Sequence, residues 1–213
     1  MSGSEETGAP PVEIRPVVPL QRKFSPIPDA FQRDDLAIEE VWPGHFQRPS
    51  VEWSTLEQAW RVVILAEAGA GKTYELRSAA SRLLGEGKAA FFIRLEDVVG
   101  NFDTAFEVGS ADSFASWESS TNDAWFFLDS VDELRLTNAR AFEDALGTFA
   151  GRIANHRQRA HVYISSRPYA WRAGIDRAVV EGLLPFAPRE DRQTFGADPG
   201  VVETQRGEAN VGF

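Results

Sequence analysis

Short apolar runs recur along the chain, and each is followed at once by small or polar residues. The runs lie at 62–65, 89–95, 124–128 and 161–164. They are rich in β-branched and aromatic residues, which predicts strands that are buried on both faces, as in a parallel sheet. We therefore expect an α/β fold in which these four runs are core strands.

Two stretches between the runs have apolar residues at the spacing of an amphipathic helix. The first follows the run at 62–65 and comprises Leu76, Ala80, Leu83 and Leu84. The second precedes the run at 161–164 and comprises Phe142, Leu146, Phe149 and Ile153. We expect the first helix to stop at Gly85 and Gly87, and the second to be capped by Thr137 and to run to about residue 154.

The loop after the first run fits a phosphate-binding pattern. Residues 66–73 read AEAGAGKT, which matches G-x-x-x-x-G-K-[ST] except at the first position, where Ala replaces Gly. A buried strand before the loop and a helix after it are the context that this pattern requires. The alternative to a phosphate-binding loop is a glycine-rich turn between a strand and a helix whose only role is close packing. The candidate nucleotide-binding residues are Ala66, Glu67, Ala68, Gly69, Ala70, Gly71, Lys72, Thr73 and Tyr74.

The residue types in this loop suit phosphate chemistry. Gly69 and Gly71 can adopt backbone angles that turn successive N–H groups toward an anion. The following helix directs its positive end at the same anion. Lys72 adds a cation for the β- and γ-phosphates, and the hydroxyl of Thr73 can ligate Mg²⁺.

Acids follow the third run, which ends in Asp129-Ser130-Val131-Asp132-Glu133. Ligands of open parallel sheets bind outside the carboxyl ends of the strands, so Asp129 should face the same crevice as the loop at 66–73. A carboxylate there can hold Mg²⁺, and a further acid, Asp132 or Glu133, can activate an attacking water. The alternative is that these acids are solvated turn residues.

Polar groups also follow the fourth run, at Ser165-Ser166-Arg167-Pro168. Ser165 or Arg167 could sense the γ-phosphate, because arginine makes bidentate contacts with phosphate. The three histidines are scattered at 45, 156 and 161, which makes a histidine-based metal site an unpromising interpretation.

Composition narrows the possible partners. The chain has 213 residues, 22 Lys+Arg against 32 Asp+Glu, and a net charge of −10, which disfavours direct binding of nucleic acid or of an anionic membrane. It has no cysteine and no apolar run long enough to cross a bilayer. Its acidic, proline-containing start lacks the apolar core of a signal peptide. We expect a cytoplasmic protein.

The chain divides into four stretches by composition. Prolines are concentrated in residues 1–30, which predicts an extended or disordered arm. Residues 31–60 are aromatic and are expected to pack as a lead-in segment. Residues 61–186 hold all the motifs. Residues 187–213 are poor in apolar residues and are expected to form a disordered tail.

With these motifs, the chain resembles the nucleotide-binding domain of the NACHT branch of the STAND ATPases. The matching segments are LAEAGAGKT at 65–73, FFLDSVDE at 126–133 and ISSRP at 164–168. In that branch a small residue follows the magnesium aspartate, and two acids come shortly afterwards. The resemblance covers about residues 55–175.

The resemblance implies a three-layer P-loop NTPase domain of the ASCE type, with a central parallel sheet flanked by helices. It implies binding of Mg²⁺ and ATP, or GTP, with slow hydrolysis. Thr73 and Asp129 would hold the metal, Asp132 and Glu133 would be catalytic, and Ser165 and Arg167 would be sensors. Such proteins are signalling switches that form homo-oligomers through the nucleotide domain, and bacterial members often serve in phage defence.

The family's later parts are missing from the pattern. No fifth strand and no winged-helix segment stand out after residue 175, so we expect a domain that is incomplete at its C-terminal end, with an exposed sheet edge. This favours a second hypothesis, a degenerate interaction module that binds no nucleotide. A third, a small-molecule kinase, fits less well, because the acids at 129–133 and the polar residues at 165–168 match a hydrolytic switch.

Overall fold

The computed structural model describes residues 23–27, 50–138, 140–186 and 200–204. Within them, seven strands form one sheet in the order β1-β7-β2-β6-β5-β3-β4. The five central strands are parallel, while β1 and β4 run antiparallel at the edges. The expected α/β fold with a largely parallel sheet is confirmed. The strands are β1 (Phe24–Pro26), β2 (Arg61–Leu65), β3 (Ala89–Arg94), β4 (Phe106–Val108), β5 (Ala124–Asp129), β6 (Ala160–Ser166) and β7 (Gly200–Thr204).

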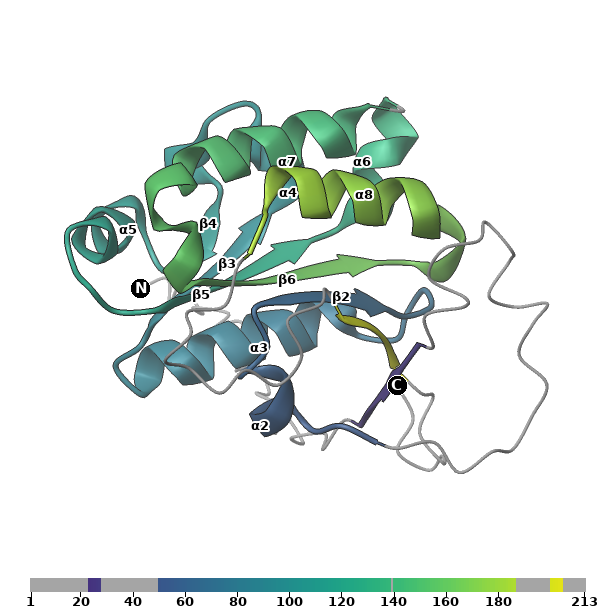
Figure 1. The fold of residues 1–213 in the computed structure, drawn as a ribbon, viewed down its shortest axis with the longest axis horizontal. Helices are drawn as coiled ribbons and strands as arrows, with labels where there is room; N and C mark the ends of the chain where they lie inside the picture. The colour runs from purple at the N-terminus through teal and green to yellow at the C-terminus, as the bar shows by residue number, and fades with distance from the viewer. Residues whose placement is uncertain (1–22, 28–49, 139, 187–199, 205–213) are drawn as a thin grey trace, which may run out of the picture.

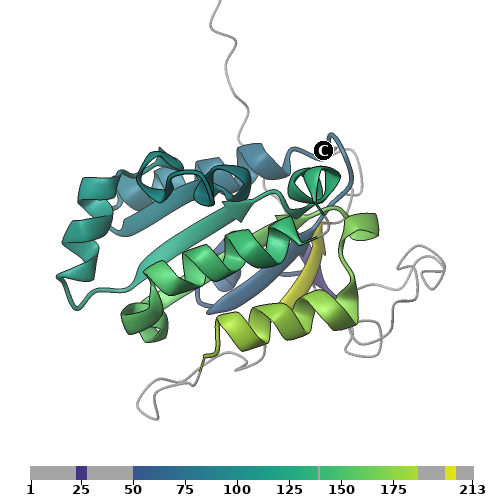
Figure 2. The same ribbon diagram turned by 90° about the horizontal axis from the view of Figure 1, so that it is seen from above.

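Helices cover both faces of the sheet, which gives three layers (Figure 1). The short α2 and the longer α3 lie on one face, and α4, α6, α7 and α8 lie on the other. Figure 2 shows α7 and α8 side by side across that second face. The helices are α2 (Trp53–Leu56), α3 (Lys72–Gly85), α4 (Leu95–Val98), α5 (Ala111–Glu118), α6 (Val131–Thr137), α7 (Ala141–Arg152) and α8 (Ala173–Leu183).

The apolar runs serve both layers because successive side chains of a strand point to opposite faces. In β2, Val62 and Ile64 pack toward α3, whereas Val63 and Leu65 join the core on the other face. In β5, Phe127 packs on the α3 side, and its neighbours Phe126 and Leu128 pack on the other. Burial on both faces explains why these strands carry no polar alternation.

Two expectations about the ends of the chain are wrong for short stretches. We expected a disordered tail at 187–213, yet β7 lies inside it and pairs in parallel with β2, Val63 opposite Val201. We expected an arm at 1–30, yet β1 pairs with β7. The edge of β2 offers unpaired N–H and C=O groups, which a short strand can satisfy even where the sequence pattern is weak. The sheet therefore continues beyond β2, and residues 1–22, 28–30, 187–199 and 205–213 lie outside the described residues.

The helix expected from Thr137 onward begins later. Thr137 is the last residue of α6, Asn138 is extended, and α7 starts at Ala141. The acids at 132 and 133 occupy the first turn of α6, where negative charge favours a helix. Residues after the third strand therefore form a short helix of their own, which the sequence analysis did not predict.

Candidate functional site

The loop between β2 and α3 contains two glycines whose backbone is left-handed. Gly69 and Gly71 have φ angles of 72° and 74°, in the left-handed region that side chains disfavour. Gly71 is the residue before α3, so the loop delivers the chain directly into the first turn of the helix. A Cβ placed on Gly69 would meet no atom within 4 Å, so the outer side of the loop opens onto free space. Ala68 and Gly69 are exposed there, whereas Ala66 and Ala70 are buried.

Lys72 folds back over this loop. Its Nζ donates to the carbonyl oxygen of Ala66 at 2.8 Å and lies 3.4 Å from that of Glu67. Burial lowers the pKa of Lys72, the charge of Asp132 opposes this shift, and Arg167 adds to it. Lys72 is thus a half-buried ammonium whose direct partners, within the described part of the chain, are two neutral carbonyl groups, and an anion at the loop would be a better partner.

Three strand or helix ends meet at Asp129, the last residue of β5. Thr73 Oγ1 in the first turn of α3 donates to Asp129 Oδ2 at 2.6 Å. The hydroxyl of Ser165, near the end of β6, donates to Asp129 Oδ1. Asp129 is 4% exposed and Ser165 is fully buried. The central position of β6, between β2 and β5, brings these three residues together as the sequence interpretation expected.

Asp132 and Arg167 form an ion pair beside them. Arg167 Nε lies 2.6 Å from Asp132 Oδ2, and this carboxylate raises the pKa of Arg167. The side chain of Asp132 is 4% exposed, against 31% for Arg167. The second oxygen of Asp132, Oδ1, is buried without a hydrogen-bond partner among the described residues. A buried carboxylate oxygen in that state needs a donor, and a bound water is the simplest one.

Glu133 differs from Asp132 although it is the next residue. It is exposed in the first turn of α6. Partial burial raises its pKa, and so do the negative charges of Glu96, Asp129 and Asp132, while Arg94 opposes them. A carboxylate with a raised pKa is a better proton acceptor than an ordinary one. The two acids therefore offer different chemistry, one a buried anchor and the other an accessible base.

The donor set fits a magnesium ion. Thr73 Oγ1 and Asp129 Oδ2 are hard oxygen ligands, which Mg²⁺ prefers, and they already lie in contact. In the part of the chain that the structure describes, no group of three His, Cys, Asp or Glu side chains could hold a metal by itself. An ion at Thr73 and Asp129 would therefore take its remaining ligands from phosphate and water, as Mg²⁺ commonly does.

One of the predicted nucleotide-binding residues, Tyr74, has an exposed side chain. Tyr74 is 43% exposed, and its role in nucleotide binding stays a prediction.

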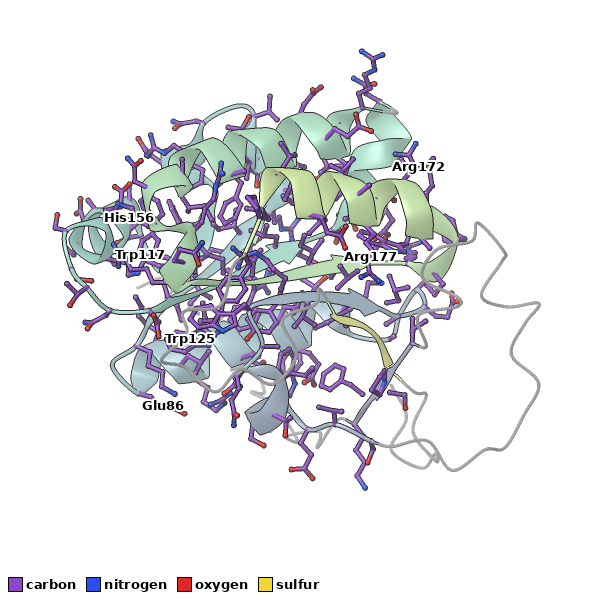
Figure 3. All side chains as sticks on the ribbon, viewed as in Figure 1. Glu86, Trp117, Trp125, His156, Arg172 and Arg177 are labelled. Carbon is purple, nitrogen blue, oxygen red and sulfur yellow. The ribbon has the colours of Figure 1, made fainter. Side chains whose placement is uncertain are left out.

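Arg172 is a further cation at the carboxyl end of the sheet, and Figure 3 labels it. It is bound to Asp176, which accepts from Arg172 Nη2 at 2.9 Å and from its backbone N–H at 2.7 Å. Arg172 therefore fixes the start of α8.

The sequence interpretation missed Arg94. This residue ends β3, and its Cα is the register partner of Asp129. It contacts Glu96 at 3.3 Å and also Glu107 of β4. The signal was present, because Arg94 closes an apolar run in the same way as Asp129 does, but a single arginine before a helix matched no motif.

Comparison with known proteins gives little further information. No family model matches the chain, and no curated protein does. Among solved structures, EssC (ATPases 2 and 3) from Geobacillus thermodenitrificans is similar at 13% identity, with a TM-score of 0.36, covering 69% of this chain. The chain spans 35%, about a third, of that protein's length. A likeness at this level carries no argument, so the inferences below rest on the geometry of the site. No helix in the described part is long and apolar enough to cross a membrane.

Proposed function

We propose that this chain binds a nucleoside triphosphate, ATP or GTP, together with Mg²⁺ and hydrolyses it slowly as a NACHT-type signalling switch. The observation that carries the proposal is the meeting of Lys72, Thr73, Asp129 and Ser165 at one end of the sheet. A glycine-rich turn that served packing alone would need no lysine, no hydroxyl and no buried carboxylate beside it. This is an α/β domain of the P-loop class in which each motif follows the strand that positions it.

The loop residues divide the work of binding. Backbone N–H groups around Gly69 and Gly71, with the start of α3, would hold phosphate oxygens. Lys72 would leave its carbonyl partners for the β- and γ-phosphates, which offer an ionic contact in place of two neutral ones. Mg²⁺ bound at Thr73 and Asp129 would supply charge neutralisation on the phosphates.

The two acids take separate roles in hydrolysis. Asp132 anchors Arg167 through Oδ2 and offers its unpartnered Oδ1 to a water. Glu133, which is exposed and has a raised pKa, accepts the proton from an attacking water. Arg167 would sense the γ-phosphate while remaining attached to Asp132, since the guanidinium has five donors. Nucleotide-dependent homo-oligomerisation, and a role in bacterial defence, belong to the same proposal.

The second candidate, an interaction module without nucleotide, has one observation in its favour. Lys72 Nζ already donates to the carbonyl oxygens of Ala66 and Glu67, so its ammonium has hydrogen-bond partners without a bound phosphate. Two observations count against this module. Asp132 Oδ1 has no hydrogen-bond partner among the described residues, and the space next to Gly69 is empty, whereas a loop that never binds a ligand would be expected to fill that space and pair that oxygen.

Calorimetric titration of the full chain with ATP, GTP and ADP, with and without Mg²⁺, tests the choice. We expect triphosphate binding that is tighter with Mg²⁺ and that Lys72→Ala weakens by about a hundredfold or more, since two charge-assisted phosphate contacts of about 1.5–3 kcal/mol each are lost. Lys88→Ala is the matched control, because Lys88 is an exposed lysine paired with Glu86, outside the site.

The thermal midpoint of each protein gives an independent reading. A ligand that binds only the folded state raises the stability of the chain, so Mg-ATP should raise the midpoint of the wild type and of Lys88→Ala but not of Lys72→Ala. If the chain is folded but ATP, GTP and ADP change neither its thermal midpoint nor the heat of titration, then the nucleotide proposal is wrong and the interaction module is favoured.

A further inference from the structure

Tyr169 comes two residues after Arg167, and its side chain is 68% exposed. Its backbone nevertheless has a defined place in the 3₁₀ turn η3 (Pro168–Ala170), which packs against α6. Pro168 is buried, and the N–H of Ala170 donates to the carbonyl oxygen of Arg167 at 3.0 Å. A short, internally bonded turn therefore carries an exposed phenol next to the candidate sensor arginine.

The phenol of Tyr169 contacts the guanidinium of Arg167. Arg167 Nη1 donates to Tyr169 Oη at 3.2 Å. The centre of the guanidinium lies 6.0 Å from the centroid of the phenol ring, which is at the outer limit of a cation–π contact. The hydroxyl is therefore the closer link between the two side chains, and the ring adds a weaker one.

Arg167 is held at two of its nitrogens and has donors left over. Its Nε forms the ion pair with Asp132 Oδ2 at 2.6 Å, and its Nη1 donates to Tyr169. Among the residues that the structure describes, Nη2 has no hydrogen-bond partner. A planar guanidinium that is held at two nitrogens cannot turn freely, so the direction of the two Nη2 N–H groups is fixed. About a third of the side chain is exposed, which leaves an anion a way to reach it.

We propose that Tyr169 is a positioning residue for Arg167, whose hydroxyl holds the guanidinium together with Asp132 so that the Nη2 donors meet the γ-phosphate of a bound triphosphate. Tyr169 touches no phosphate in this assignment and acts through Arg167. A diphosphate has no γ-phosphate, so Tyr169 contributes to a preference for triphosphate over diphosphate. The inference rests on the proposed function, because Arg167 matters as a sensor only if the chain binds nucleotide.

The first experiment needs no nucleotide. NMR of the arginine side chains in the full chain measures how fast each guanidinium rotates about its Nε–Cζ bond, and the Arg167 signals are assigned by their loss in Arg167→Gln. Tyr169→Phe keeps the ring and removes the hydroxyl. We expect it to speed the rotation at Arg167 by about threefold or more. Arg172, which is held by Asp176 instead, is the internal control and should not change.

The second experiment compares ATP with ADP. Calorimetric titration of Tyr169→Phe should show an affinity for Mg-ATP that is about threefold to tenfold weaker and an affinity for Mg-ADP that is unchanged, since a guanidinium that is no longer held must be ordered when the γ-phosphate binds. Ile175→Ala, at another exposed side chain, is the control and should alter neither affinity. A merely structural tyrosine would lower the thermal midpoint or weaken both nucleotides alike.

A double-mutant cycle shows whether Tyr169 acts through Arg167. Arg167→Gln alone should weaken Mg-ATP binding, and adding Tyr169→Phe to it should cause no further loss. A further loss as large as the one that Tyr169→Phe causes in the wild type would overturn the assignment, because Tyr169 would then act independently of the arginine.

The outcomes separate this inference from the proposed function. Faster rotation at Arg167 together with a selective loss of ATP affinity supports the assignment. Unchanged rotation, or an equal loss for ATP and ADP, overturns it even in a chain that binds nucleotide. If the wild-type chain binds neither ATP nor ADP, the proposed function is wrong, and the role of Tyr169 toward a γ-phosphate is overturned with it, whatever the rotation rates show about its contact with Arg167.

Discussion

The amino and carboxyl ends of the central strands carry different kinds of residues. At the amino ends, aromatic rings stack in a row, and the polar groups among them are bound to backbone. At the carboxyl ends, a glycine-rich loop, hydroxyls, acids and an arginine converge, and the buried Oδ1 of Asp132 has no hydrogen-bond partner among the described residues. We call the amino ends of the strands the closed edge and the carboxyl ends, which hold the candidate site, the open edge.

The closed edge is a ladder of rings. His161, at the start of β6, lies between Trp60 and Trp125 with ring centroids 3.8 Å and 4.7 Å away. Phe186 stacks on Trp60 at 4.7 Å, and the ammonium of Lys88 lies over Trp125. Figure 3 labels Trp125, which lies in β5. Such stacking buries large apolar areas.

Arg61 completes the closed edge. Its guanidinium is bound by carbonyl oxygens, among them those of Trp60 at 2.7 Å and Leu184 at 3.1 Å. Burial, together with the nearby charge of Arg157, lowers the pKa of Arg61 to about 10, so it remains charged at neutral pH. A buried cation saturated by carbonyls ties chain segments together, whereas Arg167 at the other end keeps about a third of its side chain exposed.

The largest effect on stability should come from the closed edge. Trp60→Ala removes a ring that is 7% exposed and stacked on both sides, which should lower the free energy of unfolding by about 3–5 kcal/mol. Denaturant unfolding measures it. Val99→Ala, at a side chain that is 58% exposed, is the control and should change stability by about 0.5 kcal/mol or less. A small loss in Trp60→Ala would mean that the ladder is incidental.

The next effect concerns ligand binding at the open edge. Asp129→Asn keeps an acceptor for the neighbouring hydroxyls but removes the charge that suits Mg²⁺. The Mg²⁺-dependent part of ATP affinity should fall by about tenfold or more, while affinity without Mg²⁺ is unchanged or improved. Titration with and without Mg²⁺ measures both, and Asp103→Asn, on an exposed carboxylate paired with Arg152, is the matched control. An equal loss under both conditions would contradict a metal role.

A smaller effect on stability is expected from Ser165→Ala. The change removes the hydroxyl that donates to Asp129 Oδ1 and leaves a buried carboxylate oxygen short of a partner. The free energy of unfolding should drop by about 1–2 kcal/mol. Ser116→Ala, where an exposed hydroxyl donates to a helix carbonyl, should be nearly neutral. If both changes cost the same, then Ser165 is not a specific support of Asp129.

The smallest effect is a difference in sign between two glutamates. The pKa of Glu133 is raised in the folded chain, so the fold binds the proton more tightly than the unfolded chain does, and stability falls as pH rises through the titration. The pKa of Glu86 is lowered by its bonds to Lys88 and Arg82, so its contribution is present at neutral pH and is lost as pH falls.

Substitution by glutamine should reveal that sign. Relative to wild type, Glu133→Gln should be slightly more stable at pH 7 than at pH 3, whereas Glu86→Gln should be slightly less stable at pH 7 than at pH 3. Thermal unfolding at both pH values, at low salt, measures the difference. The same sign in both variants would contradict the raised pKa of Glu133 that partial burial and the charges of Glu96, Asp129 and Asp132 produce.

Much of the open edge could be predicted from local sequence. Loop residues 66–73 carry their own conformational requirement in Gly69 and Gly71, and Asp129 and Ser165 directly follow apolar runs. Parallel strands deliver their carboxyl ends to one edge, so these residues were expected to meet. Arg94 was not found, because its position near the site depends on lying opposite Asp129 in the ladder, and strand order cannot be read from a single run.

Strand identity and loop chemistry were therefore determined by the sequence itself, because burial on both faces requires unbroken apolar runs and a left-handed turn requires glycine. Tertiary structure decided which strands are neighbours, which acid is buried and which is exposed, and that β7 pairs with β2 although its own pattern is weak. Those outcomes depend on contacts between residues far apart in the chain. Asp132 and Glu133 are adjacent in sequence, yet only the packing around α6 makes one an anchor for Arg167 and leaves the other facing solvent.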